Sequence, residues 1–133
     1  MQSTRLLSIA KSLSVAIIIL GIIHDIATFT PLIRGGLTSL DAENMNAITY
    51  ISLICGTALV LSGTILFKLL GKLSEYSFLF STLNIIGIFL ALNGILAVIY
   101  MFNNPFAWMA LVLNIGMFGV IQLLKPKANT NSK

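Results

Sequence analysis

The sequence predicts an all-α integral membrane protein, a bundle of four transmembrane helices. Of its 133 residues, 57% are hydrophobic and only 9% are charged, whereas soluble domains carry about a quarter charged residues. The apolar residues also fall in four long runs rather than in amphipathic stripes, and a helix needs roughly 20 such residues to cross a bilayer. The length is that of one domain. We therefore expect a single four-helix transmembrane domain over residues 1–133.

The four runs give the expected spans. They lie at about residues 8–29, 47–70, 77–100 and 105–124. Pro105 suits the first turn of the last span, because the N–H that proline lacks would have no helical partner there. We expect the first span to be kept as a signal anchor, because Asp25 stands where a cleavage site requires a small neutral residue.

One connection is long enough to have a structure of its own. Residues 30–46 contain Pro31 and a glycine pair, and we expect an external loop there. Ser39 or Asp41 is a suitable N-cap for a helix that leads into the second span. The polar tail, residues 126–133, is expected to be disordered.

The basic residues predict the orientation in the membrane. Seven of them flank the spans on one side, against Arg34 alone on the other. The seven are Arg5, Lys11, Lys68, Lys72, Lys125, Lys127 and Lys133. The positive-inside rule then places both termini in the cytoplasm. We expect a multi-pass protein of a cell membrane, in particular a bacterial cytoplasmic membrane.

The outer end of the first span contains two ionisable side chains, His24 and Asp25. An ionisable group in a span costs about 2.5–3.5 kcal/mol on insertion scales, so it normally faces the bundle or water. Ser14, Gly21 and Thr28 recur at every seventh residue and share one helix face, where small side chains let a second helix approach closely. His24 and Asp25 lie on opposite sides of this stripe. Asp25 can then pair with a neighbouring helix, reach Arg34 across the loop, or lean outward to water.

Two asparagines extend this polar region to other spans. Asn93 falls about 7 Å to the outer side of the midplane, and Asn114 lies near the centre of its span. We therefore predict an outward-facing polar pocket around His24 that binds a ligand or a proton. Its candidate residues are His24, Asp25, Thr28, Asn93 and Asn114. The alternative is structural: His24 donates to Thr28, Asn93 or a backbone carbonyl, and the asparagines hold helices together.

Several kinds of chemistry are disfavoured. One histidine beside one aspartate falls short of the three or four ligands of a metal site, so no metal or cofactor is expected. No GxSxG, HExxH or P-loop motif occurs, so no catalytic residue is assigned and an enzyme ranks last. Cys55, the single cysteine, cannot form an intramolecular disulfide and is expected to be a small buried hydrophobe. The basic residues are scattered near helix ends, so no nucleic acid is expected as a partner.

Glycines in the second and third spans also recur at every seventh residue. They are Gly56 with Gly63 and Gly87 with Gly94. We expect both pairs to mark close contacts between helices.

The leading hypothesis is a non-enzymatic binding or accessory protein that holds an amphipathic small molecule or docks on a larger membrane complex. The first alternative is a proton-coupled small-molecule transporter that acts as a homodimer. The second is an immunity-type protein that blocks a pore-forming toxin within the lipid bilayer. In length, number of spans and inward termini, the chain resembles the DoxX-like group of small bacterial membrane proteins and the small multidrug transporters. These general features assign no role to any residue.

Overall fold

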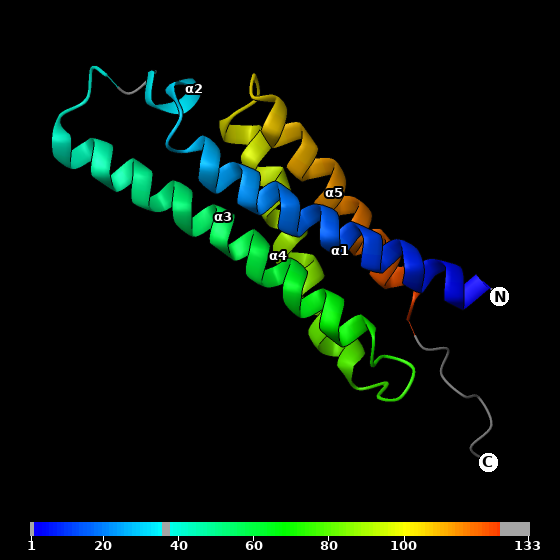
Figure 1. Ribbon diagram of the computed structural model, residues 1–133. Helices are drawn as coiled ribbons and strands as arrows, with labels where there is room; N and C mark the ends of the chain where they lie inside the picture. Colours follow the sequence, from blue (N-terminus) through cyan, green and yellow to red (C-terminus); the bar gives the residue numbers. More distant parts are fainter. Residues whose placement is uncertain (1, 36–37, 126–133) are drawn as a thin grey trace, which may run out of the picture.

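The structure is a computed structural model that describes residues 2–35 and 38–125. It contains four long helices and one helical turn, and each long helix is long and apolar enough to cross a membrane (Figure 1). They are α1 (Gln2–Ala27), the turn α2 (Pro31–Arg34), α3 (Ala42–Leu70), α4 (Leu79–Tyr100) and α5 (Pro105–Leu123). The all-α four-helix class is thus confirmed, and the chain is a multi-pass membrane protein. The expected disorder of residues 126–133 lies outside the described residues.

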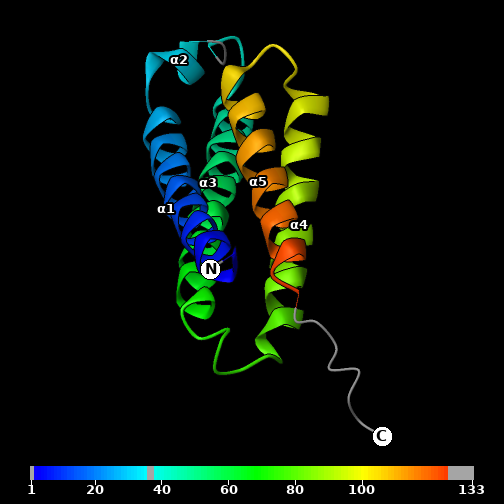
Figure 2. The same ribbon diagram turned by 90° about the vertical axis from the view of Figure 1, so that its right-hand side faces the viewer.

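Consecutive long helices run in opposite directions (Figures 1 and 2). The start of α1, the α3–α4 connection and the end of α5 therefore lie at one end, here called the basic end. The turn α2 and the α4–α5 connection lie at the other, here called the α2 end. α1 packs mainly on α3, and α4 mainly on α5, whereas α1 contacts α5 less and α3 contacts α4 least. The bundle thus consists of two tightly packed pairs, with α1 and α4 diagonally opposed.

α1 and α3 begin ahead of their expected spans, whereas α4 begins two residues later than expected, at Leu79. α1 begins at Gln2, ahead of its expected span. α3 begins at Ala42 because the Asp41 carboxylate accepts a hydrogen bond from the Asn44 N–H, at 2.8 Å. This bond, together with one from the Asn44 side chain, holds the pKa of Asp41 below its usual value. α5 begins at Pro105 as expected, with Asn104 accepting from the Phe106 N–H at 2.9 Å. Hydropathy marks only the apolar part of each helix, so it misses these end turns.

Glycines bring the backbones of α1 and α3 together. A β-carbon built on Gly21 would lie 2.7 Å from the Gly56 carbonyl oxygen, and one built on Gly63 would lie 2.8 Å from the Ser14 carbonyl oxygen. Real β-carbons do not approach oxygen so closely. The stripe of Ser14, Gly21 and Thr28 therefore faces α3, and Gly56 and Gly63 meet it. We call this contact the α1–α3 seam.

A similar contact joins α4 and α5. A β-carbon on Gly94 would lie 2.9 Å from the Leu111 α-carbon, and one on Gly87 would lie 3.0 Å from the Ile121 side chain. Both glycine pairs singled out by their spacing therefore mark close helix contacts, as predicted.

The interior is filled unevenly along the bundle axis. The large apolar side chains of the core lie between the middle of the bundle and the basic end: Ile17, Leu20, Leu59, Leu66, Leu70, Leu83, Leu90, Met117 and Ile121. Small residues are buried among them, namely Ala10, Ser14, Ser62, Gly63 and Gly87. From the middle to the α2 end, the buried residues of the described chain are small or polar: Gly21, Thr28, Gly56, Ala91, Gly94, Ala107, Ala110 and Asn114. Half-buried Phe106 is the large side chain that packs against the core from this half. The apolar core therefore occupies only the half of the bundle nearer the basic end.

The α1–α3 seam makes a prediction about stability. Gly63→Ala forces a methyl group against the α1 backbone, and we expect a loss of about 1–3 kcal/mol in the free energy of unfolding. Gly119→Ala is the matched control, because a β-carbon there meets nothing within 4 Å, and alanine is favoured over glycine in a helix by roughly 0.5–1 kcal/mol. Equilibrium unfolding in mixed micelles measures both. Equal stability of the two variants would contradict the seam.

Candidate functional site

Three side chains connect α1 and α3 toward the α2 end. The Ser52 hydroxyl oxygen lies 3.1 Å from His24 Nε2 and 2.6 Å from the Thr28 hydroxyl oxygen. The Thr28 hydroxyl also donates to the His24 carbonyl oxygen at 3.0 Å, which occupies its only proton. Ser52 therefore donates to Thr28, and His24 Nε2 donates to Ser52. A neutral His24 then carries its proton on Nε2 and leaves Nδ1 as a free acceptor.

The positions of these groups follow from the α1–α3 seam. Thr28 is the outermost member of the small-residue stripe, and it is buried. Ser52 lies one turn before Gly56 on the same face of α3. Because the glycines allow the two backbones to approach, short hydroxyl side chains can reach from one helix to the other. His24 thus bonds to Ser52 rather than to Thr28, Asn93 or a backbone carbonyl, and Ser52 lies between His24 and Thr28.

Asp25 lies on the other side of the stripe, against Gly56. A β-carbon built on Gly56 would overlap the Asp25 carboxylate. The carboxylate oxygen Oδ1 is buried and accepts no hydrogen bond. A buried polar group without a partner is costly, and native proteins rarely leave one unpaired. The Asp25 carboxylate therefore packs against the neighbouring helix, α3, without pairing with it.

Arg34, the basic residue of the α2 end, does not neutralise Asp25. Its guanidinium carbon lies 5.5 Å from the centre of the Phe29 ring, in a cation–π arrangement. No salt bridge to Asp25 occurs in the described part of the chain. The carboxylate therefore stands without a cationic side chain opposite it.

The two asparagines of the predicted site are not joined to His24. Asn114 is 0% exposed, lies beside Gly94, and makes no hydrogen bond through its side-chain oxygen or nitrogen. Asn93 is half-buried on α4, which is diagonal to α1. Within residues 2–35 and 38–125, no hydrogen bond connects either asparagine with His24, Asp25 or Thr28. The structure thus brings together only the α1 candidates, with Asn114 as a separate buried amide.

Sequence reasoning missed Ser52 and Gly56 as parts of this site. Their spacing could have identified them. Ser52 and Gly56 are four residues apart, Gly63 follows seven residues later, and these intervals put all three on one face of the helix. The expectation for Cys55 is wrong, because the thiol is exposed. Cys55 precedes Gly56 by one residue and is rotated about 100° away from the α1–α3 seam.

The site offers few ligands for a metal. In the described ranges, His, Cys, Asp and Glu side chains do not gather in groups of three or more. Two shallow surface hollows lie elsewhere: one at the basic end, and one on α5 around Trp108 and Met109. The side chains of the site suit hydrogen bonding and charge pairing.

Comparison with protein-family models, with curated proteins and with solved structures found no match to this chain. Fold and site geometry are therefore the basis for assigning a function.

The hydrogen bond between His24 and Ser52 predicts energetic coupling across the α1–α3 seam. In a double-mutant cycle with His24→Ala and Ser52→Ala, we expect a coupling free energy of about 0.6 kcal/mol, the average for hydrogen bonds between membrane helices. Thr64→Ala is the control, because the Thr64 hydroxyl donates within α3 to the Val60 carbonyl. Its effect should add to that of His24→Ala. Additivity of the Ser52 and His24 changes, measured by unfolding in mixed micelles, would refute the contact.

Proposed function

We propose that the protein is a binding or accessory protein of a bacterial cytoplasmic membrane that holds a small amphipathic molecule around His24. The observation that carries this proposal is the buried, unpaired Oδ1 of Asp25 beside the His24–Ser52–Thr28 hydrogen bonds. Ionisable groups inside spans are expensive and serve a function by default. A bound molecule that donates to Asp25 would remove the cost of the unpaired oxygen.

The filling of the bundle supports the same location. Toward the α2 end the buried residues are glycine, alanine, threonine and asparagine, so they contribute little apolar surface to the core. Binding sites combine apolar walls with a few placed polar groups. The apolar part of an amphipathic ligand would pack against these small residues, and its polar group would donate to Asp25.

A specific observation favours proton-coupled transport as a second candidate. Asp25 is a carboxylate without a cationic partner in the described residues, and the imidazole of His24, the next residue, is a side chain that binds and releases protons. Two such groups can exchange a proton for a bound cation. A homodimer would place a second copy of this site in the same assembly.

The unpaired carboxylate predicts which polar group binds best. In protein reconstituted into zwitterionic nanodiscs, decylammonium should raise the unfolding temperature more than decanol or decanoate, because only the cation both donates to Asp25 and neutralises it. Asp25→Asn should abolish this difference, whereas Thr64→Val should leave it intact. Equal effects of the three probes on the wild-type protein would reject the proposed site.

The same titration separates binding from transport. If Asp25 exchanges a proton for the cation, decylammonium should release protons into a weakly buffered solution, and a pH-indicator dye would record them. Binding without proton release would reject the transporter and leave the binding protein.

We also propose that both termini lie in the cytoplasm. Arg5, Lys11, Lys68, Lys72 and Lys125 belong to the segments that meet at the basic end, and Arg34 lies at the α2 end. This asymmetry supports the orientation that the positive-inside rule predicts.

Thiol labelling tests the orientation. In a Cys55→Ser background, Ser39→Cys should react with a membrane-impermeant maleimide on intact cells. Ser74→Cys, in the α3–α4 connection, should react only after the membrane is opened. The reverse pattern would overturn the assignment.

A further inference from the structure

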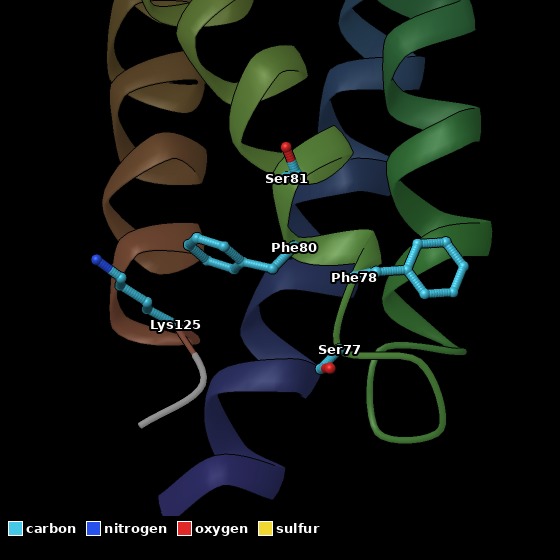
Figure 3. Close-up of a pocket in the computed structure, with 5 residues that line it drawn as sticks. All are labelled: Ser77, Phe78, Phe80, Ser81 and Lys125. Atoms are coloured by element: carbon cyan, nitrogen blue, oxygen red, sulfur yellow. The ribbon is translucent and has the colours of Figure 1, made fainter. Parts of the chain in front are cut away.

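The basic end has a shallow surface hollow of about 380 Å³. It is lined by the residues around the first turn of α4 and by the last described residue after α5: Ser77, Phe78, Phe80, Ser81 and Lys125. In Figure 3, Phe80 extends toward α5 and Phe78 toward α3, with the two serines on the α4 side between them. The hollow lies far from His24, at the opposite end of the bundle.

The charge around the hollow favours an anion. The described residues of the basic end include five basic side chains, and its acidic residue, Glu75, is already paired with Lys72 at 3.2 Å. The other acidic residues of the chain, Asp25, Asp41 and Glu43, lie toward the α2 end. Lys125 is thus a cation at the rim of the hollow without an acidic neighbour there.

The backbone of α4 adds to this preference. A helix N-terminus carries a partial positive charge. The hydroxyl groups of Ser77 and Ser81 are exposed beside this turn. The first N–H groups of α4, those of Leu79, Phe80 and Ser81, already donate to backbone carbonyl oxygens. The donors open to phosphate oxygens are therefore the Lys125 ammonium and the two serine hydroxyls.

The depth of the hollow matches the lipid headgroups. α4 has 22 residues, a length of about 33 Å, which is close to the hydrocarbon thickness of about 30 Å. The first turn of α4 therefore lies at the boundary between acyl chains and headgroups. A charged group bound there keeps its contact with water.

An apolar stripe continues from the hollow into the membrane. Ile85, Ile88 and Leu92 follow Ser81 at helical spacing, so all four residues share one face of α4. The three apolar side chains are exposed, with Ile85 at 64%. Free phosphate would not use this surface, whereas the acyl chains of a phospholipid would lie along it.

We propose that this hollow is a binding site for an anionic phospholipid. Lys125 supplies the countercharge for the phosphate, Ser77 and Ser81 donate hydrogen bonds, and the acyl chains pack along Ile85, Ile88 and Leu92. The proposal is independent of the function proposed for His24.

Site-specific fluorescence quenching tests the proposal. Phe78→Trp in a Trp108→Phe background gives a single fluorophore at the hollow, since Trp108 is the only native tryptophan and Phe78 is exposed. In vesicles of mixed lipids, brominated phosphatidylglycerol should quench it with an apparent affinity about fivefold above that of brominated phosphatidylcholine. Native Trp108, at the α2 end, should show no such preference.

Matched variants identify the residues involved. Lys125→Gln should abolish the preference recorded by the Phe78→Trp fluorophore, and Lys125→Arg should keep it. Lys68→Gln removes the same charge from the same end outside the hollow and should preserve most of the preference. If Lys68→Gln and Lys125→Gln reduced the preference for phosphatidylglycerol equally, the preference would come from general electrostatic attraction to the membrane surface. That result would overturn the proposed site. Loss of the preference on adding inorganic phosphate, at an ionic strength matched with chloride, would identify free phosphate as the ligand and equally overturn it.

Discussion

The close approach of the α1 and α3 backbones is the constraint on which the site depends. Between membrane helices there is no hydrophobic driving force, because lipid is as apolar as leucine, so packing and hydrogen bonds must hold them together. Gly21 and Gly63 meet carbonyl oxygens of the opposite helix and leave no room for a side chain. This short separation lets Ser52 reach His24 and presses Asp25 against Gly56. A wider separation would remove both arrangements together.

Stability and the candidate site are divided between the two halves of the bundle. Large apolar side chains from all four long helices fill the half toward the basic end. In the other half, small and polar residues leave groups such as Asn114 and the Asp25 carboxylate without partners. At the membrane boundary of the filled half, the Asn84 and Gln122 side chains bond to each other and link α4 with α5. Polar residues that only hold helices together thus find partners here, in contrast to Asp25 and Asn114.

The fold was predictable because four apolar runs determine four spans, and short polar connections make neighbours antiparallel. The seven-residue spacing of Ser14, Gly21 and Thr28 correctly predicted the face of α1 that meets another helix. The α3 residues that meet this face were harder to predict, because hydropathy along α3 does not reveal how that helix is rotated about its axis. Ser52 was therefore missed, and Cys55 was wrongly expected to be buried. The orientation of the Asp25 side chain could not be predicted either, because it depends on the space beside Gly56, which forms only when α1 and α3 pack together.

The position of Asp25 also has a consequence for biosynthesis. The ribosome makes α1 first, but the glycine surface that receives its carboxylate is on α3, about 30 residues later in the chain. Until α3 is made, neither Ser52 nor Gly56 is present to contact His24 and Asp25. The segment that contains α2 connects the two helices, so it and α3 must be made before α1 can pack on α3.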